Sequence, residues 1–417
     1  MKVLYIHQYF RKPSQGGPLR SYFLAKTLVN NGYEVEMITA CNRKQYVCEN
    51  IDGITVHYLP VYYDNRLGFF SRVIAFIKFI YKAYNVSKSI QNINYCYITS
   101  TPLTVGVIGL LLKKYKGIPF YFEVRDLWPE APIQIGIIKN NIVKKLLFSL
   151  EKNIYSNAEG IIALSPGIKN SILKVVPEKS VIEIPNMSDC NFFNNGQKDE
   201  GLVDKYNVSG KFVITYFGAV GRVNQLSYML DVVRVCKEKG LNDIFFIIAG
   251  KGAEMQNIQR SAQKSALNNL GFLDFLNREN LKELLNISDA VFISFAKIPV
   301  IQSSSPNKFF DAIASGSLCI VNFQGWIKEL IENNRCGFYC DPEKPEEFIK
   351  KITPFIRNNE LLSQGRNNAR KLAESKFSRE MLAKRFLRLF ITNTKIPINA
   401  NDTNKHLAPD LVLQADV

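Results

Sequence analysis

The sequence predicts an α/β protein in which two domains are each built on a parallel sheet. Short apolar runs alternate with helix-length segments along most of the chain, which is typical of strands covered by helices on both faces. This alternation breaks off once and then starts again, which indicates a second domain. A chain of 417 residues, 47% of them hydrophobic, is long enough to give each domain its own core.

Seven apolar runs in the first half are predicted to be strands. They are Val3–Ile6, Val35–Thr39, Ile54–Leu59, Tyr95–Thr99, Phe120–Val124, Ile161–Leu164 and Val181–Ile184. The second half contains shorter runs near Leu270 and Phe338 and four longer ones. The longer runs are Phe212–Phe217, Ile244–Ala249, Ala290–Phe295 and Leu318–Phe323.

The alternation breaks near Asn186–Gly210, a segment that is rich in Asn, Asp, Lys and Gly. We therefore expect one domain over residues 1–190 and a second over residues 211–376. A helix over 377–391, with apolar residues at helical spacing, is expected to pack back on the first domain. Residues 392–417 are polar and aperiodic, so a disordered tail is expected there.

The chain is strongly basic, with 53 Lys and Arg residues against 37 Asp and Glu residues and a net charge of +16. This charge favours a polyanionic partner, either a nucleic acid, an anionic membrane or a phosphorylated substrate. The eight cysteines form no Cys-x-x-Cys pair, so we expect reduced thiols in a cytosolic protein and no zinc site. The apolar run after Lys2 is too short for a signal peptide. No uninterrupted apolar stretch reaches the ~20 residues that a membrane span needs.

One stretch, Ile301–Gly316, combines several features of an anion site. It is predicted to be a loop that leads directly into a helix, with Ser305 as the N-cap and Pro306 in the first turn. A helix start presents free N–H groups and a partial positive charge, and Lys308 adds a full charge. Asp311 lies about 1.5 turns into the helix, where a carboxylate can accept hydrogen bonds from a ribose. The stretch predicts a binding site for the diphosphate of a nucleotide-sugar, although an ordinary capped helix begins in the same way.

Glycines also follow the first strand of the first predicted domain. Gly16 and Gly17 lie between that strand and a helix that begins near Arg20. A glycine pair at this place lets the backbone approach a ligand closely, although an ordinary loop has the same composition.

The second predicted domain repeats this arrangement. Gly218–Gln225 follows its first strand and contains Arg222, which can bind a diphosphate bidentately or remain a surface arginine. Gly250 and Lys251 end the next strand, but the rest of a P-loop is missing, so a P-loop ATPase is excluded.

Charged residues and a tryptophan follow the predicted strand Phe120–Val124. Asp126 and Glu130 are candidates for acid–base chemistry or for binding an acceptor hydroxyl. Arg125 and Asp126 can instead form a structural ion pair at the edge of the sheet. Histidine chemistry depends on His7, because the other two histidines lie in a predicted strand and in the tail.

Two predicted helices carry apolar and aromatic residues interleaved with basic ones, which is typical of helices that lie on an anionic membrane. The first is Leu67–Ile90 and the second is Ile137–Leu150. Each helix alone is equally consistent with burial and snorkelling lysines, whereas the pair favours membrane contact. The basic residues are Arg66, Arg72, Lys78, Lys82 and Lys88 beside and within the first helix, and Lys139, Lys144 and Lys145 in the second.

The order of elements and four motifs resemble the GT-B glycosyltransferases of family 4, over about Met1–Phe390. The motifs are Gly16–Arg20, Val124–Pro129, Gly218–Arg222 and Ser304–Gly316. The resemblance implies two Rossmann-like, doubly wound domains that face each other across a cleft, with the donor held mainly by the second domain. Within the family, the chain looks like the bacterial enzymes that build O-antigen, capsule and colanic-acid-type polysaccharides.

The resemblance also implies which residues form the site. The catalytic positions are Asp126, Arg125 and Ser303. The donor-binding positions are Gly17, Gly218, Arg222, Asn224, Gly250, Lys251, Ser304, Ser305, Asn307, Lys308 and Asp311.

Two positions depart from the family pattern. The family usually has two glutamates eight positions apart in the donor loop, and with Asp311 at the second position the first falls on Ser303. Many relatives have a histidine before the first-domain aspartate, where this chain has Arg125. The two changes leave open an altered donor or a weak enzyme.

The resemblance implies a retaining glycosyltransferase, of hexosyl or N-acetylhexosaminyl type, that moves a sugar from a UDP-linked donor to a lipid-linked saccharide. The nucleotide-sugar would be a co-substrate and no metal would be needed, because Arg222, Lys308 and a helix start can offset the diphosphate charge. The enzyme would lie on the inner face of the cytoplasmic membrane, on an anionic surface, with no nucleic acid as partner. A nucleotide-sugar 2-epimerase and a non-catalytic sugar-nucleotide-binding scaffold are the alternatives.

Overall fold

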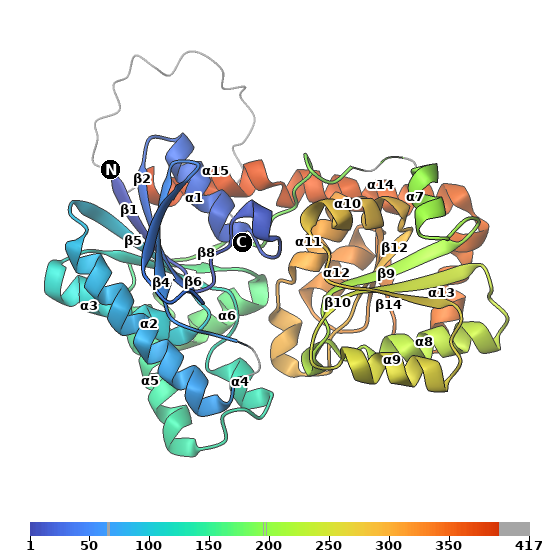
Figure 1. The fold of residues 1–417 in the computed structure, drawn as a ribbon, viewed down its shortest axis with the longest axis horizontal. Helices are drawn as coiled ribbons and strands as arrows, with labels where there is room; N and C mark the ends of the chain where they lie inside the picture. The colour runs from blue at the N-terminus through green and yellow to red at the C-terminus, as the bar shows by residue number, and fades with distance from the viewer. Residues whose placement is uncertain (65–66, 195, 197, 392–417) are drawn as a thin grey trace, which may run out of the picture.

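The computed structural model describes residues 1–64, 67–194, 196 and 198–391, and it has two lobes that lie side by side (Figure 1). Among these residues each lobe contains one sheet with helices on both faces, so the predicted α/β architecture with two doubly wound units is confirmed. The expected tail, 392–417, and Arg66 lie outside the described residues.

The first sheet has eight strands within the described part of the chain, in the order β3-β4-β2-β1-β5-β6-β7-β8. Its strands are β1 (Lys2–Ile6), β2 (Glu34–Cys41), β3 (Val47–Ile51), β4 (Ile54–Pro60), β5 (Ile93–Thr99), β6 (Phe120–Val124), β7 (Gly160–Ala163) and β8 (Val181–Glu183). The sequence did not predict β3, which pairs antiparallel with β4 at the edge. Its residues alternate between half-buried and exposed, so it has no continuous apolar run.

The second sheet, counted over the same described ranges, has six parallel strands in the order β11-β10-β9-β12-β13-β14. They are β9 (Phe212–Ala219), β10 (Ile244–Lys251), β11 (Leu270–Leu273), β12 (Ala290–Ile293), β13 (Leu318–Val321) and β14 (Gly337–Tyr339). All six coincide with apolar runs in the sequence.

The helices follow the strands in alternation. Those of the first lobe are η1 (Pro13–Gln15), α1 (Arg20–Asn30), α2 (Phe69–Ser89), η2 (Leu103–Val105), α3 (Gly106–Lys116), α4 (Glu130–Gln134), α5 (Asn141–Asn157) and α6 (Pro166–Val175). Those of the second lobe are α7 (Glu200–Lys205), η3 (Arg222–Asn224), α8 (Ser227–Glu238), α9 (Met255–Lys264), α10 (Arg278–Ile287), η4 (Pro299–Ser303), α11 (Asn307–Ala314), α12 (Trp326–Asn333), α13 (Glu347–Arg357), α14 (Asn359–Leu372) and the π-helical turn η5 (Ala373–Phe377).

The last helix, α15 (Arg379–Ile391), joins the two lobes. It continues the direction of α14 along one side of the molecule and reaches the sheet of the first lobe (Figure 1). Phe386 and Phe390 are fully buried there, with their rings 4.9 Å from Tyr97 and 5.6 Å from Tyr121 respectively. The Tyr121 hydroxyl donates to the carbonyl oxygen of Leu389 at 2.9 Å. The chain therefore returns to the first lobe after completing the second.

Strand order reverses beside β1 in the first sheet and beside β9 in the second. In the first sheet the chain adds strands on one side of β1 and then resumes with β5 on the other side. In the second sheet β10 and β12 flank β9 in the same way. Parallel sheets leave a crevice at the carboxyl ends of the strands at such a reversal, and ligands bind there. The residues that follow β1, β5, β9 and β12 are therefore the first place to look for a site.

A buried ion pair holds the centre of the first lobe together. The guanidinium of Arg20, at the start of α1, donates to Glu123 Oε2 on β6 at 2.9 Å, and both side chains are almost fully buried. The Glu123 carboxylate also accepts from the hydroxyls of Tyr97, at 2.7 Å, and Thr99. Arg20 donates further to the carbonyl oxygens of Ile184 and Pro185. Burial by itself would raise the pKa of Glu123, but Arg20 and these donors lower it to about 2.

We predict that Glu123→Ala lowers the free energy of unfolding by about 3–5 kcal/mol at pH 7, because it leaves the charge of Arg20 buried and unpaired. Denaturant titration checks this. The matched control is Glu283→Ala, which breaks an exposed pair with Lys205 and should change stability much less. The folded pKa of Glu123, about 2, is below its ordinary value of 4.5, so its stabilisation is complete above that value and is lost as the pH falls towards 2. Equal effects of the two variants at pH 7 would contradict the prediction.

Candidate active site between the two lobes

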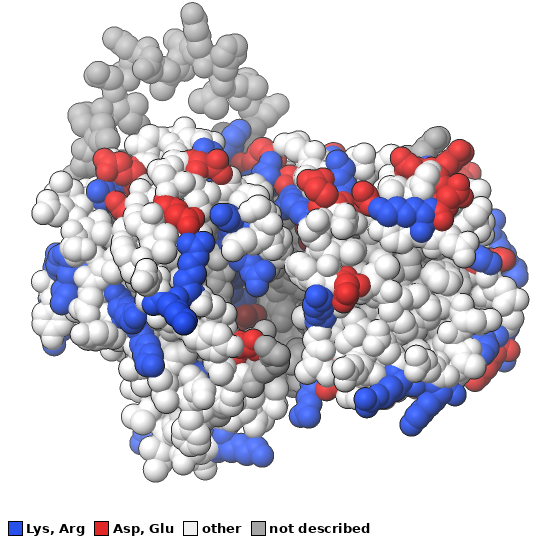
Figure 2. Space-filling model, in the orientation of Figure 1, with Lys and Arg blue, Asp and Glu red and all other residues white. Residues whose placement is uncertain are grey.

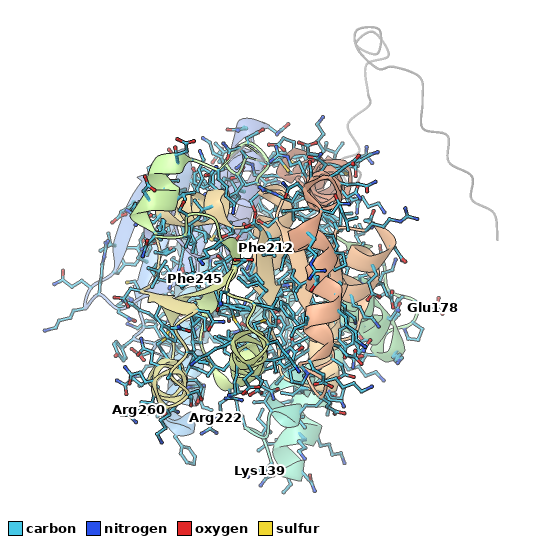
Figure 3. All side chains as sticks on the ribbon, turned by 90° about the vertical axis from the view of Figure 1, so that its right-hand side faces the viewer. Lys139, Glu178, Phe212, Arg222, Phe245 and Arg260 are labelled. Carbon is cyan, nitrogen blue, oxygen red and sulfur yellow. The ribbon has the colours of Figure 1, made fainter. Side chains whose placement is uncertain are left out.

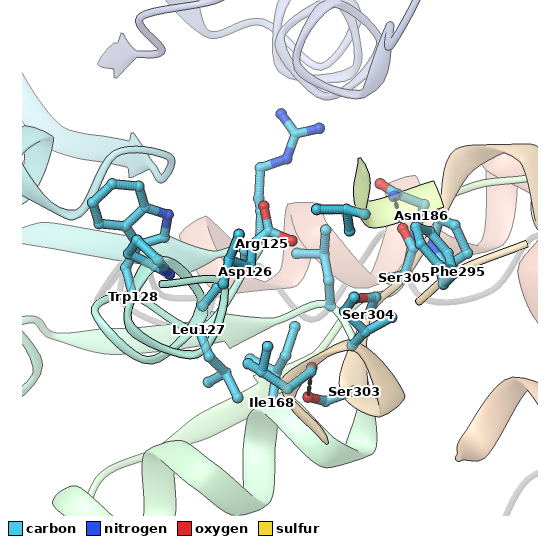
Figure 4. A pocket seen from close by; sticks show the side chains of 18 of the residues that line it. Arg125, Asp126, Leu127, Trp128, Ile168, Asn186, Phe295, Ser303, Ser304 and Ser305 are labelled. Carbon is cyan, nitrogen blue, oxygen red and sulfur yellow. Dashed lines mark hydrogen bonds between the residues drawn. The ribbon is translucent and has the colours of Figure 1, made fainter. Parts of the chain in front are cut away.

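Two cavities open between or beside the lobes, and they meet at one group of residues. The smaller, of about 410 Å³, is lined by the loop after β6 on one side and by residues of η4 and the start of α11 on the other (Figure 4). The larger, of about 1170 Å³, lies beside the residues that follow β1 in the first lobe, and Phe275 of the second lobe also lines it. Arg125, Asp126 and Trp128 line both cavities. A ligand in either cavity therefore reaches the same three side chains.

The first-lobe wall is the segment that follows β6. The Arg125 N–H donates to Ser100 Oγ at 3.0 Å, and the Arg125 guanidinium lies 3.2 Å from His7 Nε2. Burial lowers the pKa of His7 well below its ordinary value, and Arg125 lowers it further, so the imidazole is neutral and accepts from the guanidinium. Arg125 thus contacts His7, which argues against the alternative of a structural ion pair with Asp126.

Asp126 lies where the two cavities meet. Its side chain is open to solvent, yet the surrounding protein raises the pKa of its carboxyl, an effect that Arg125 opposes. Figure 4 shows Arg125, Asp126 and Trp128 on one side of the smaller cavity and Ser303, Ser304 and Phe295 on the other. Glu130, the second predicted acid, accepts from Gln134 at 2.7 Å and lines neither cavity.

The second-lobe wall is docked onto the first lobe by hydrogen bonds. Ser165 Oγ, at the start of α6, donates to the carbonyl oxygen of Ser303 at 2.5 Å. Asn186, in the linker after β8, donates its amide to the carbonyl oxygen of Ser305 at 2.6 Å. The Ser303 hydroxyl itself donates to the Val300 carbonyl oxygen at 2.8 Å.

The predicted N-cap is wrong. The helix α11 begins at Asn307, its N-cap is Pro306, and no side chain caps it within the described structure. The Ser305 hydroxyl accepts instead from the Asn186 N–H at 3.3 Å, because the linker passes alongside it. Ser304 contributes its carbonyl oxygen to the indole N–H of Trp326 at 2.8 Å. The first N–H groups of α11 thus remain without a side-chain cap beside the cavity, where Asn307 lies.

Lys308 lies next to the glycine that ends β9. Its Nζ donates to Tyr216 Oη at 2.8 Å and faces the ring of Phe295, a cavity residue, at 5.4 Å. A Cβ atom at Gly218, whose φ is +116°, would lie only 3.8 Å from Lys308 Cε. Burial lowers the pKa of Lys308 to about 7. The expected full charge is therefore corrected to a partial one at neutral pH, because aromatic rings replace water around the ammonium.

Asp311 lies one helical turn further along α11. Burial raises the pKa of its carboxyl to about 7, while Arg278 opposes this effect. Arg278 is already paired with Asp189, which also accepts from Arg379 at 2.8 Å. A ligand hydroxyl would thus find at Asp311 a group that can donate or accept near neutral pH.

The other predicted donor residues are spread around this centre. Arg222 points outward, with a side chain that is 93% exposed and lies 3.7 Å from Glu254, at the periphery in Figure 3. Lys251 is exposed at the end of β10. Asn224 is buried, and its Oδ1 accepts from the Gly221 N–H at 3.3 Å. Arg222 and Lys251 are therefore open to solvent, and neither lines either cavity.

Two predicted glycines have a clear structural reason. A Cβ atom at Gly250 would lie 1.9 Å from the carbonyl oxygen of Gly218, so glycine is needed where the ends of β9 and β10 meet. Gly17, with φ at +79°, lines the larger cavity rather than the smaller one.

Sequence reasoning missed several residues that line the cavities or contact the predicted site residues. Tyr216 and Asn186 are inside or next to apolar runs, so nothing local marks their contacts with Lys308 and Ser305. Arg11 and Lys12 line the larger cavity. Their position directly after His7–Phe10, close to the end of the first strand, could have indicated a place in the site, but the prediction there rested on the glycine pair alone.

Two family models match the chain. The model described as "Glycosyl transferases group 1" matches residues 200–372, and the model described as "Glycosyl transferase 4-like domain" matches residues 16–186. The chain is 23% identical over 287 residues to WcaI of Escherichia coli K12, a glycosyl transferase provisionally named for colanic acid biosynthesis, covering 66% of this chain and 69% of WcaI. It is 22% identical over 247 residues to WbjE of Pseudomonas aeruginosa, also provisionally named a glycosyltransferase, covering 58% and 61%. The match spans about two thirds of the length of these relatives.

Solved structures share the arrangement of both lobes. Sucrose-phosphate synthase from Thermosynechococcus elongatus superposes with a TM-score of 0.74 at 15% identity, over 94% of this chain and 98% of that one. HepE of Anabaena in complex with UDP-glucose gives 0.69 at 16% identity, over 94% and 100%. WaaG, a glycosyltransferase involved in lipopolysaccharide biosynthesis, gives 0.68 at 12% identity, over 94% and 100%. At these identities the likeness concerns the fold, which is GT-B. Together with the two family models, it shows that the chain belongs to the family 4 glycosyltransferases of the GT-B fold.

Proposed function

We propose that this glycosyltransferase moves a hexosyl or N-acetylhexosaminyl group from a UDP-linked donor to a lipid-linked saccharide of a surface polysaccharide, with retention of configuration. The observation that carries the proposal is the meeting of the two cavities at Asp126. One cavity is bordered by the start of α11 in the second lobe, and the other lies mainly beside first-lobe strands, with Phe275 of the second lobe in its wall. Donor and acceptor would then approach Asp126 from opposite sides.

The donor half of the proposal rests on the residues around α11. The uncapped start of this helix and Lys308 can offset the charge of a diphosphate. Asp311 can bind the ribose. The ion pair of Arg222 with Glu254 is exposed and 3.7 Å long, so it holds the guanidinium weakly and leaves it available for a phosphate. HepE was solved with UDP-glucose and with UDP, which supports a UDP-linked donor for this chain.

The chemistry would run on one face of the donor sugar. The leaving phosphate would help to take the proton of the acceptor hydroxyl, and Asp126 would bind that hydroxyl and orient it. Ser303 offers no carboxylate near the donor sugar, and its hydroxyl is engaged by Val300. Closure of the lobes around both substrates would exclude water and favour transfer over hydrolysis. The names of WcaI and WaaG support a role in building a surface polysaccharide.

The first lobe also offers a surface that fits an anionic membrane. On α2, one stripe is exposed although it is apolar: Phe70, Ile74, Ile77 and Tyr81, with Phe70 81% exposed. The opposite stripe of the same helix, Ala75, Phe79 and Ala83, is buried in the core. On α5, Ile142 and Leu146 are exposed in the same way. Both helices lie in the lower part of the first lobe in Figure 1, and Lys139 lies at its lower end in Figure 3.

Basic residues accompany this apolar surface. Lys78 and Lys88 on α2 and Lys145 on α5 are exposed, while Arg72 and Lys82 are half-buried. An apolar stripe with a basic border matches the boundary between anionic headgroups and acyl chains. We therefore propose that α2 and α5 hold the first lobe on the inner face of the cytoplasmic membrane. No described helix is long and apolar enough to cross a membrane.

We predict that Lys308→Ala and Arg222→Ala each weaken UDP binding by about 1–3 kcal/mol, because each removes a charge-assisted hydrogen bond to the diphosphate. Calorimetric titration measures it. In the unaltered chain the affinity should fall as the pH rises above about 7, since Lys308 then loses its proton, whereas Lys308→Ala should lack this dependence. If both variants keep their fold and bind UDP with unchanged affinity, the diphosphate does not bind at Lys308 and Arg222.

We also predict that turnover persists in excess chelator. The described residues contain no group of three His, Cys, Asp or Glu side chains that could hold a metal ion. The positive groups around α11 can take over the neutralisation of the leaving diphosphate. The measurement is release of UDP from the donor with EDTA present. Complete loss that magnesium or manganese restores would point to a metal-assisted reaction.

The membrane proposal predicts binding to vesicles that contain an anionic phospholipid. Lys78→Gln/Lys88→Gln/Lys145→Gln should weaken binding by on the order of 100-fold at low salt, at about 1 kcal/mol per lysine. The matched control, Lys264→Gln/Lys350→Gln/Lys371→Gln, removes three exposed lysines of the second lobe and should bind like the unaltered chain. Vesicle sedimentation at two salt concentrations provides the measurement. Equal binding of the two variants would exclude this surface.

A further inference from the structure

We propose that the larger cavity binds a phosphate or diphosphate group of the acceptor, through Arg11, Lys12 and Arg43. This inference rests on the proposed function, since it assigns a chemical class to the acceptor of that reaction. The cavity reaches Asp126, where the acceptor hydroxyl would react, and extends from there past the residues that follow β1. An acceptor in it would place its hydroxyl at Asp126 and its anionic group at the basic side chains.

The charge of the cavity wall favours an anion. Among the described residues that line it are Arg11, Lys12, Arg43 and Arg125, against the acids Asp64 and Asp126. Neither Arg11 nor Lys12 forms an ion pair with a described residue, although Arg43 and, to a lesser extent, the charge of Lys12 lower the pKa of nearby Glu49. On the face shown in Figure 2, Lys and Arg side chains gather on the first lobe beside the hollow between the lobes.

The backbone around Arg11 is shaped to hold its side chain in the cavity. At Gly17, whose φ is +79°, a Cβ atom would lie 3.5 Å from both Cδ and Nη1 of Arg11. This is an ordinary contact distance, so the arginine lies against the loop at Gly17, and the positive φ is what favours glycine there. The Lys12 N–H donates to Gln15 Oε1 at 3.0 Å and fixes the turn between them. Gly17, predicted as a donor residue, therefore lies beside Arg11 in the larger cavity.

Arg43 lies in the connection between β2 and β3 and is held there by two contacts. Its guanidinium lies 2.8 Å from Glu49 and 5.4 Å from the ring centre of Tyr58. The side chain is still half-exposed, so part of its donor fork is open to the cavity. The loop that faces it is locked by two hydrogen bonds between Asn42 and the backbone of Tyr63, at 2.9 and 3.2 Å.

Buried polar groups in the same cavity point to a ligand with hydroxyls. Gln8 is fully buried, and neither atom of its amide has a hydrogen-bond partner in the described structure. His7 Nδ1, also buried, lacks one as well. Buried polar groups are nearly always paired, so an exception that lines a cavity indicates a molecule that completes the bonds. A saccharide supplies hydroxyls that both donate and accept.

The far wall of the cavity is aromatic and leads to α2. Tyr9 packs on Tyr63 with ring centres 5.1 Å apart, and Tyr63 stacks on Phe76 of α2 at 5.9 Å. All three rings line the cavity. A phosphate that joins a saccharide to a lipid would lie between the polar floor and this wall, while a soluble sugar phosphate would use the basic groups alone. The chemistry common to both is an acceptor that carries a phosphate.

The test uses inorganic pyrophosphate, titrated into the full chain after it has been saturated with UDP. We expect one further binding site in the unaltered chain, weakened about tenfold or more in Arg11→Gln/Lys12→Gln and unchanged in the matched control Lys264→Gln/Lys371→Gln. Equal UDP affinity in all three proteins shows that the donor site is intact. No binding to the UDP-saturated chain, or equal binding by the two variants, overturns the inference.

A second experiment distinguishes a lipid-linked from a soluble acceptor. Farnesyl diphosphate and glucose 6-phosphate are each tested as competitors of pyrophosphate. Competition by farnesyl diphosphate indicates a lipid-linked acceptor, competition by glucose 6-phosphate indicates a soluble one, and either result supports the inference. Failure of both overturns it. If UDP does not bind the unaltered chain, the proposed donor fails, and the titration without UDP still decides whether Arg11 and Lys12 bind phosphate.

Discussion

The arrangement of the site depends on the buried contact between Arg20 and Glu123. A carboxylate with no solvent exposure is stable only when donors surround it, and here three side chains from β5 and α1 converge on Glu123 of β6. Glu123 lies two residues before Arg125 and three before Asp126, so fixing the end of β6 also fixes both site residues. Because Arg20 also binds the carbonyl oxygens of Ile184 and Pro185, the same network positions the linker that leads to Asn186 and the second lobe.

The site itself exists only because the lobes contact one another. Ser165 and Asn186 of the first half hold the backbone of Ser303 and Ser305. These bonds bring the start of α11 opposite Asp126, and the backbone N–H of Asn186 also engages the Ser305 hydroxyl, which was predicted to cap the helix. The helix start thus keeps its unpaired N–H groups where a diphosphate would need them. The contact also has an apolar part, because Val300 and Ile301 of η4 are buried in the core cluster of the first lobe.

Burial shifts the pKa of two titratable side chains on α11, Lys308 and Asp311. Lys308 lies over aromatic rings and Asp311 lies within the packed second lobe, so burial moves the pKa of each to about 7 from opposite directions. Both side chains are half-buried, and an anion bound beside Lys308 would interact with it more strongly than at a fully exposed surface. If the proposed donor diphosphate binds beside Lys308, it would favour the charged lysine and couple donor binding to proton uptake.

The sequence by itself determined the architecture. Continuous apolar runs located the strands of both sheets except β3, and the polar break near Asn186–Gly210 falls between β8 and β9. The strings around Trp128-Pro129 and Pro306-Asn307-Lys308 marked the two walls of the smaller cavity. These features are local, because a buried strand or a helix start imposes a pattern on neighbouring residues along the chain.

Only the tertiary structure decided how those residues are used. The N-cap at Ser305 was displaced by Asn186, more than a hundred residues away, and the charge of Lys308 was reduced by the rings of Tyr216 and Phe295. The structure likewise brought Arg11 and Arg43 to one cavity and left Arg222 on the outside. The physical reason is the same each time: hydrogen-bond partners and pKa values depend on which groups surround a side chain in space. In a fold built of parallel strands those groups come from distant parts of the sequence.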